Sequence, residues 1–219
     1  MRIAQPLALA LRALVRQARR AAALALLAAA TTTQAAPFDL AADAVLGQPG
    51  FTTGTPNNGG LSATSLSSPA GVATDPVSGR LWVADFSNHR VLGWASATAF
   101  TSGQAASIVI GQASFAANAA NRGGAPTAAT LFSPANVAVD GSGNLYVADR
   151  DNHRVLRYSA PFASGMSATL VLGQGANVYT TSTANKGGIS ATSLSGPTDV
   201  VPGPGGSLYV VDGNNHRVL

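Results

Sequence analysis

The stretch that decides the fold runs Leu145-Tyr-Val-Ala-Asp-Arg-Asp-Asn-His-Arg-Val-Leu156. Two short runs rich in β-branched and aromatic residues flank a polar Asp-x-x-Asn-His-Arg segment, which is typical of two strands joined by a tight turn. The segment occurs three times, at spacings of 64 and 63 residues, with its first residue at Asp85, Asp149 and Asp212. A Gly-Gln pair recurs at a similar spacing and ends at Gln48, Gln112 and Gln174. Two markers with one period indicate a structural repeat.

Each repeat predicts four short strands, because apolar runs alternate with Gly, Asp, Asn and Pro. In the first repeat we expect them at 71–74, 80–84, 90–94 and 107–111. Four-stranded antiparallel sheets in tandem are the blades of a β-propeller. A parallel solenoid is disfavoured, since the short connections are suited to hairpins rather than crossovers. The sequence therefore predicts an all-β fold with three propeller blades, centred on residues 69–94, 134–158 and 197–219.

The units resemble NHL repeats, on the Asn-His-Arg-Val-Leu segments at 88–92, 152–156 and 215–219 and on the Leu-Trp-Val-Ala-Asp type of run that precedes each. The resemblance implies a β-propeller but no single activity, because NHL proteins include RNA-binding, protein-binding, receptor and lyase-type members. The third copy departs from the pattern. Gly203 stands where the other copies have Asp75 and Asp140, and Pro202 interrupts its first strand, which predicts a looser inner edge.

Three blades form an incomplete ring, because propellers usually have about four to eight. An isolated strand expected at Ala44–Gly47 precedes the first blade and brings the expected strands to twelve. We expect the chain to be a fragment of a longer propeller, with six blades in total. The alternative is a dimer in which two three-bladed chains close one six-bladed ring by exchanging that strand.

Residues 1–35 predict a helical signal peptide. Five arginines precede the apolar run Ala21–Ala30, and small residues follow it as far as Ala36. The run covers about half of the roughly 20 residues needed to cross a bilayer, so we expect no membrane span after cleavage at Ala35. The mature domain would then be residues 36–219, secreted or periplasmic. A mitochondrial presequence is the alternative, since the first 38 residues are rich in Arg and Ala and contain no acid.

Removal of the leader reverses the apparent basic charge. Five of the 13 Lys and Arg residues lie within it, so eight remain against nine acidic residues. Binding to nucleic acid through bulk charge needs a clear basic excess on the folded domain, so we expect no nucleic-acid partner. All the acidic residues are Asp, which favours turns over helices. With no Cys, the fold must rely on its core.

The Asp-x-x-Asn-His-Arg turns have a structural interpretation. An Asp side chain accepts hydrogen bonds from turn amides, and the Asn and Arg that follow can link one blade to the next. We assign this role to the same three residues of each copy, namely Asp85, Asn88, Arg90, Asp149, Asn152, Arg154, Asp212, Asn215 and Arg217.

The candidate binding face combines these turns with the long loops that precede each blade. Because successive strands alternate in direction, we expect both to emerge on the same side of the propeller. Loops this long between short strands indicate binding or packing over the blade. The candidate binding residues are Asn58, Arg122 and Lys186 from the loops and His89, His153 and His216 from the turns. We expect apolar loop residues to pack as lids, namely Leu66, Leu131, Leu194, Phe51 and Phe115.

The three histidines do not predict a metal site, although a metal sits on the propeller axis of the lyase-type proteins that the units resemble. One ion needs its ligands within about 2.1 Å, and equivalent turns on separate blades are too far apart for that. The sequence contains no Gly-rich phosphate loop, nucleophile elbow or HExxH helix. We therefore expect no catalytic residue, metal or cofactor, and a binding or scaffold role toward a protein or glycan outside the cell or in its envelope. The alternative is a propeller-type lyase or hydrolase whose active residues lie in missing blades.

Overall fold

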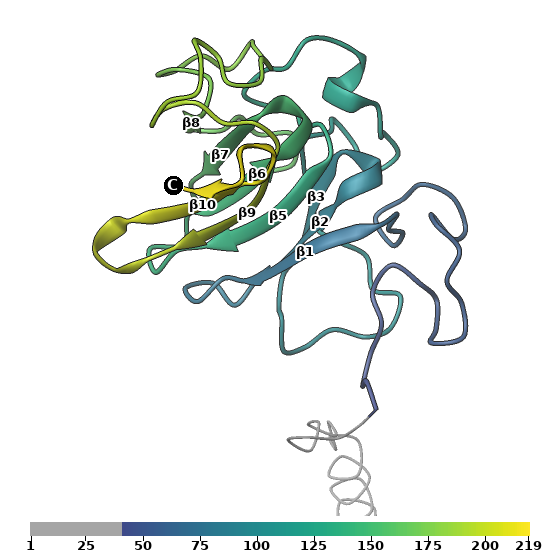
Figure 1. Cartoon of the computed structure of the whole chain (residues 1–219). Coiled ribbons are helices and arrows are strands. Elements are labelled where there is room, and N and C mark those ends of the chain that lie inside the picture. Colours follow the sequence, from purple (N-terminus) through teal and green to yellow (C-terminus); the bar gives the residue numbers. More distant parts are fainter. Residues whose placement is uncertain (1–40) are drawn as a thin grey trace, which may run out of the picture. The chain divides into compact units, whose positions relative to one another are not determined.

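A computed structural model describes residues 41–219 (Figure 1), and the predicted signal peptide at residues 1–35 lies outside them. The strands form three antiparallel sheets in which consecutive strands are neighbours. The first blade holds β1 (Pro69–Thr74), β2 (Leu81–Asp85), β3 (Arg90–Trp94) and β4 (Ile108–Ile110). The second holds β5 (Pro134–Val139), β6 (Leu145–Asp149), β7 (Arg154–Tyr158) and β8 (Leu170–Leu172). The third holds β9 (Pro197–Pro202), β10 (Leu208–Asp212) and β11 (Arg217–Val218). The predicted all-β blades are confirmed.

The first strands of the three blades lie side by side (Figure 1), with β1 next to β5 and β5 next to β9. Their approach is close at Gly71, where a Cβ atom would lie 2.7 Å from the Cα of Asn136. At the equivalent place between the second and third blades, the side-chain amide of Asn136 donates a hydrogen bond to the carboxylate of Asp199. These strands form the inner edge that the propeller pattern predicts.

Within each blade, the second and third strands are joined by a 3₁₀ turn that ends in a left-handed residue. The turns are η1 (Phe86–Asn88), η3 (Arg150–Asn152) and η5 (Gly213–Asn215), and the residue after each is His89, His153 or His216, with φ between 51° and 53°. Two further 3₁₀ segments, η2 (Ala120–Gly123) and η4 (Pro204–Gly206), lie in connections. In the part of the chain that the structure describes, no helix has the length and apolarity needed to cross a membrane.

The isolated strand expected at residues 44–47 is not formed, so that prediction is wrong, and residues 41–219 contain eleven strands rather than the twelve expected. The reason is the lack of a partner strand among residues 41–219. Val45 instead accepts a hydrogen bond from the Gly103 amide (2.9 Å) and donates one to Ser102 Oγ (3.2 Å), both in a loop of the first blade. In the second blade, Gly165 and Ser164 make the same two contacts with Val109 of β4. The segment therefore occupies the place that a fourth strand has in a complete blade, but it lacks the backbone hydrogen bonds to a neighbouring strand.

The inner edge of the third blade is as regular as the others, contrary to expectation. β9 contains six residues, as do β1 and β5, and Pro202 is its last residue, opposite Leu208. Pro202 therefore ends the strand instead of interrupting it. Gly203 leads into η4, a short turn that replaces the hydrogen bonds made by Asp75 and Asp140 in the other blades.

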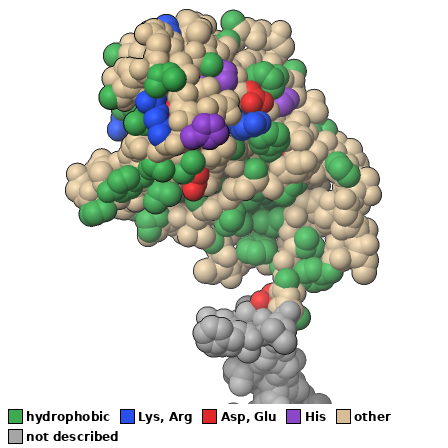
Figure 2. Space-filling view, viewed as in Figure 1, with side chains coloured by type: hydrophobic (Ala, Val, Ile, Leu, Met, Phe, Trp, Pro, Cys, Tyr) green, Lys and Arg blue, Asp and Glu red, His purple; other side chains and the backbone are tan. Residues whose placement is uncertain are grey.

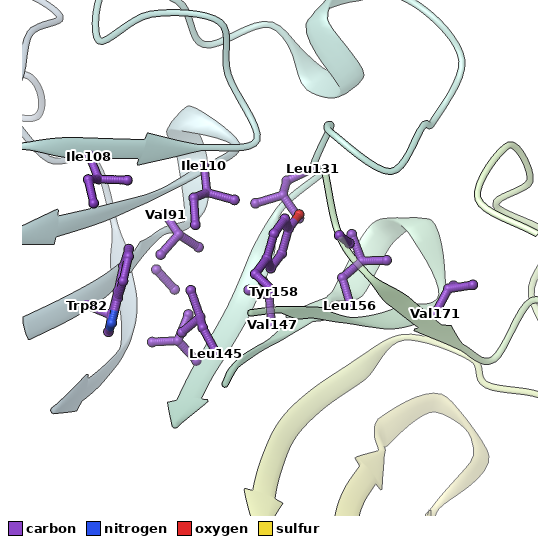
Figure 3. Packing of buried hydrophobic residues seen from close by; sticks show 13 residues of the cluster. Trp82, Val91, Ile108, Ile110, Leu131, Leu145, Val147, Leu156, Tyr158 and Val171 are labelled. Atoms are coloured by element: carbon purple, nitrogen blue, oxygen red, sulfur yellow. The ribbon is translucent and has the colours of Figure 1, made fainter. Parts of the chain in front are cut away.

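The hydrophobic core lies between blades. Side chains of the first blade, including Trp82, Val91 and Ile110, pack in one cluster with Leu145 and Tyr158 of the second (Figure 3). A smaller cluster joins the second blade to the third. Every residue of β2 is buried, whereas only two of the five in β10 are. The difference follows from position, because the third blade is covered on one side only.

Candidate binding face

The Asp of each repeat turn organises the hairpin around it. In the second blade, one carboxylate oxygen of Asp149 accepts a hydrogen bond from the backbone amide of Phe132 (2.7 Å). The other accepts from Asn152 Nδ2 (2.8 Å) and from Arg154 Nε (2.7 Å). The first and third blades repeat these bonds through Asp85, Asn88 and Arg90 and through Asp212, Asn215 and Arg217. Each carboxylate thus accepts hydrogen bonds from three donors of its own repeat.

The Arg of each turn fixes the long loops through their backbone. Arg154 donates from Nη2 to the carbonyl oxygens of Thr127 and Thr130 (both 2.9 Å), in the loop before its blade. Its Nη1 donates to the carbonyl of Tyr179 (2.6 Å), in the loop after it. Arg90 makes the equivalent bonds to Ser62, Ser65 and Phe115. In the first two blades, one buried guanidinium therefore holds two loops in place through hydrogen bonds to their backbone carbonyls.

Pairs of asparagines join turns to loops. Asn152 and Asn121 exchange two side-chain hydrogen bonds of 2.9 Å, and both residues are buried. The same reciprocal pair occurs between Asn57 and Asn88 and between Asn185 and Asn215. These contacts confirm that the repeat turns and the long loops emerge on the same face.

The histidines of the first two blades lie at junctions between blades. His89 Nδ1 accepts a hydrogen bond from the backbone amide of Ser133 (3.0 Å), and the His89 carbonyl accepts one from Gln112 Nε2 (3.0 Å). His153 makes the same contacts with Gly196 and Gln174. Burial lowers the pKa of both imidazoles, although nearby aspartates, first of all Asp151, act in the opposite direction. A neutral ring with a free Nδ1 lone pair is what these amide contacts require.

His216 is exposed, and no side-chain hydrogen bond of this residue occurs within residues 41–219. The structure thus places the three histidines in equivalent turns without bringing them together. No cluster of His, Cys, Asp or Glu able to hold a metal ion occurs among the described residues.

The three loop candidates occupy equivalent positions but differ in their surroundings. Arg122 is exposed and reaches back weakly to the carbonyl oxygens of Gly111 and Gly165 (3.3 and 3.4 Å). Lys186 Nζ donates to Thr181 Oγ1 (3.1 Å), and Asn58 Nδ2 donates to Gln48 Oε1 (3.2 Å). Arg122 is therefore the most available of the three for a ligand. In the space-filling view, charged and histidine side chains lie close together on one part of the surface, with hydrophobic side chains beside them (Figure 2).

The predicted apolar lids are formed by the leucines. Leu66, Leu131 and Leu194 are buried, and each covers a glycine of the Gly-Gln marker. A Cβ at Gly111, for example, would lie 2.6 Å from Leu131 Cδ1. Phe115 also packs against the core, but Phe51 is 59% exposed, so the lid expected there is not formed. Phe51 has no described blade before it against which to pack.

The glutamines of the Gly-Gln marker are structural residues that sequence reasoning left unassigned. Gln112 and Gln174 are fully buried and bridge a histidine carbonyl of one blade to the loop that follows. The signal in the sequence is their regular spacing, because a polar residue at the same place in every repeat is expected to bind the same kind of partner in each blade.

Three antiparallel blades that share an inner edge define a protein of the β-propeller class. Within that class, residues 66–94 and 133–158 match the family model of the NHL repeat, so the chain carries NHL repeats in its first two blades. Both matched segments contain the Asp-x-x-Asn-His-Arg turn.

Solved structures similar to the chain include a streptogramin B lyase, which is 10% identical with a TM-score of 0.40 over 72% of this chain and 37% of that one. A gluconolactonase from Xanthomonas campestris is 19% identical with a TM-score of 0.42, over 69% and 36% of the two chains. A luciferin-regenerating enzyme is 17% identical with a TM-score of 0.41, over 67% and 38%. The chain thus spans little more than a third of these proteins, and similarity at this level carries no argument about activity. No curated protein matches the chain.

Proposed function

We propose that the protein is an exported binding or scaffold module that contacts a protein or glycan through its turn-and-loop face, the face formed by the repeat turns and the long loops before each blade. The observation that carries this proposal is how the loops are held. The same carbonyl oxygen of each loop accepts a hydrogen bond from Arg90, Arg154 or Arg217. Because these bonds involve only the backbone, the loop side chains can differ from blade to blade while the loop backbone is held in the same place. A rigid support with variable side chains is the usual arrangement of a binding surface.

The side chains on this face include groups suited to recognition. Arg122 is exposed, and its planar guanidinium can pair with carboxylates or stack on rings. Ile189, in the loop before the third blade, is 68% exposed. Arginine is enriched among the interface residues that contribute most to affinity, and an exposed apolar side chain beside it adds surface that a partner can bury. By contrast, the conspicuous Asp, Asn and Arg residues of the repeat turns are engaged in holding the blades.

A binding screen tests the proposal. The purified chain is applied to an array of bacterial envelope glycans and to a displayed peptide library. The selected ligand is then measured against Arg122→Asn with Lys186→Asn, which copies the residue that the first loop carries at Asn58. We expect affinity to fall at least about tenfold, the effect of roughly 1.4 kcal/mol. Val77→Ser, in the exposed turn between β1 and β2 on the other face, is the matched control and should leave affinity unchanged.

The opposite pattern would overturn this assignment: a ligand whose affinity falls with Val77→Ser and not with the loop variants. The same holds if neither library yields a ligand.

Export is tested separately by expressing the full chain in a bacterial host. We expect the protein outside the cytoplasm with Ala36 as its new N-terminus, because residues 1–35 have the pattern of a cleavable leader. Retention of Met1 on cytoplasmic protein would contradict this part of the proposal.

A further inference from the structure

The side chain of Arg122 lies in a small site where the first and second blades meet. Its Nε donates to the carbonyl oxygen of Gly111, just after β4, and its Nη2 donates to that of Gly165, between β7 and β8 (3.3 and 3.4 Å). A guanidinium carries several N–H donors in one plane, so one group can bind two separate oxygens. Arg122 is exposed although blades lie on both sides of it, so this place stays open to solvent between two complete blades.

The first repeat has the same backbone frame, with Gly103 at the position of Gly165. A Cβ atom on Gly103 would lie 3.6 Å from the carbonyl oxygen of Gln48, and one on Gly165 would lie 3.7 Å from that of Gln112. Both glycines also donate their amides to a valine of the segment that ends in this glutamine (2.9 and 2.8 Å). The loop and the segment that form the site are therefore placed alike in the two repeats.

The residue inside the frame differs between the repeats. Asn58 stands at the position of Arg122 and turns to Gln48, where its Nδ2 donates to Oε1 (3.2 Å). A Cβ on Gly165 would lie 3.5 Å from Arg122 Nη2, whereas one on Gly103 would meet no side chain of the described residues within 4 Å. A pocket of about 330 Å³ is left in the first repeat. Its walls include Gln48, Pro49, Asn58, Thr64, Ser102 and Gly103.

The chemistry of this pocket favours a cation with more than one N–H donor. The carbonyl oxygens of Gly47 and Gly103 correspond to the two that Arg122 contacts, and they accept no hydrogen bond within residues 41–219. The residues that line the pocket carry no charge. Hydrogen bonds from a charged donor to a neutral oxygen are stronger than those from a neutral donor. The second repeat therefore shows which chemical group fits the frame that the first repeat leaves open.

We propose that this pocket binds the guanidinium of an arginine side chain of a partner protein. The guanidinium takes the place that Arg122 fills in the second repeat and donates to the carbonyl oxygens of Gly47 and Gly103. An arginine from a partner is not attached to the loop backbone, so it can approach both oxygens more closely than Arg122 does. The inference rests on the proposed binding role and adds an exposed arginine to the description of the ligand.

The first test uses one arginine with blocked ends, N-acetyl-arginine N-methylamide, as the probe. It is titrated to millimolar concentration into the purified, isotope-labelled chain, and backbone amide signals are followed by NMR. We expect a saturable shift at Gly103, and none at Gly165, because Arg122 fills that site. The citrulline analogue, in which a neutral urea replaces the guanidinium, should bind at least about tenfold more weakly. No saturable shift at Gly103, or equal binding of the two probes, would overturn the proposal.

Exchanging residues between the repeats tests the location of the site. Asn58→Arg supplies a guanidinium from within the loop and should abolish the shift at Gly103. Val77→Arg adds the same charge in the exposed turn between β1 and β2 and should leave the shift unchanged. Arg122→Asn empties the equivalent place and should add a saturable shift at Gly165, an outcome that does not depend on how well the Asn58 variant folds. Binding that survives Asn58→Arg, or the lack of a second site in Arg122→Asn, would contradict the assignment.

Free arginine distinguishes a partner protein from a small molecule as the source of the guanidinium. An arginine within a protein has no charged amino or carboxylate group on its backbone, so the blocked probe should bind at least as tightly as free arginine. Tighter binding of free arginine, by about tenfold or more, would assign the pocket to the amino acid instead. Failure of the blocked probe would remove this inference alone, because the proposed function is judged by the ligand selected in the binding screen.

Discussion

The second and third blades contain the same turn in two different environments. Arg154 and Asp149 are completely buried and lie 2.7 Å apart, whereas Arg217 lies 2.8 Å from a buried Asp212 but is itself 24% exposed. The geometry of the ion pair is therefore set by the blade alone. The neighbouring blade adds burial, one carbonyl acceptor for the guanidinium and two donors for the histidine. The turn thus holds its own blade together, and it also joins that blade to the next one where a next blade is present.

The largest expected difference between these blades concerns the ion pair. Burial raises the pKa of Asp149, and the charge of Arg154 counteracts this. Arg154→Ala leaves a buried carboxylate uncompensated, at a cost of about 3–5 kcal/mol. Arg217→Ala should cost less, roughly 1.5–3 kcal/mol, the range for hydrogen bonds to charged groups. Urea unfolding of the two variants checks this order. Equal costs would show that the turn does not depend on its neighbour.

The glycines of the Gly-Gln marker give the next effect. At Gly173, φ is 97° and a Cβ would lie 2.8 Å from both the His153 carbonyl oxygen and Leu194 Cδ1. Gly173→Ala should destabilise by roughly 1–3 kcal/mol from overpacking, plus about 1 kcal/mol from the left-handed backbone. At Gly47 the short contacts are with Leu66 alone, a side chain that can move at the free edge. Gly47→Ala should therefore cost less in the same unfolding assay, and a cost as large as that of Gly173→Ala would contradict the comparison.

The histidines should give a smaller difference. His153→Asn keeps a residue that accepts positive φ but withdraws the acceptor for the Gly196 amide, at a cost of about 1 kcal/mol. His216→Asn removes no side-chain hydrogen bond of the described chain and should leave the free energy of unfolding unchanged. A loss at His216 equal to that at His153 would mean that the left-handed position, and not the junction, determines the cost.

The smallest effect is a dependence of stability on pH. The pKa of His89 and of His153 is lowered by burial in the folded chain, so the unfolded chain, with histidine near about 6.5, takes up protons first. The contribution is therefore fully present above that pH and is lost as pH falls below it. We expect a lower urea midpoint at about pH 5.5 than at about pH 7.5. The variant carrying His89→Asn and His153→Asn should show a smaller decrease. If the urea midpoint of this variant falls as much as that of the unmodified chain, the pH dependence is due to other groups.

The repeat pattern predicts the blades well, because strand, turn and hairpin depend on neighbouring residues. The expected strand at 90–94 coincides with β3, and the Asp, Asn and Arg assigned to structure hold each turn. The features that were not predicted depend on the next blade. Phe51 is exposed and residues 44–47 lack a ladder because their partners are not local in sequence. The junction role of His89 also needs three dimensions, since its donor Ser133 lies 44 residues away.

The guanidinium contacts with loop carbonyls have a consequence for engineering. An anchor that recognises main-chain oxygen fixes the path of a loop at the two bound carbonyls but places little demand on its composition. The loop ahead of the second blade already has an extra Pro126 relative to the other two, yet Arg154 holds it through the same pair of carbonyls. Foreign recognition segments can therefore be grafted between the asparagine and the leucine of each loop, for example between Asn121 and Leu131, if the two carbonyl positions are retained. The chain would then serve as a display framework with three independently exchangeable loops.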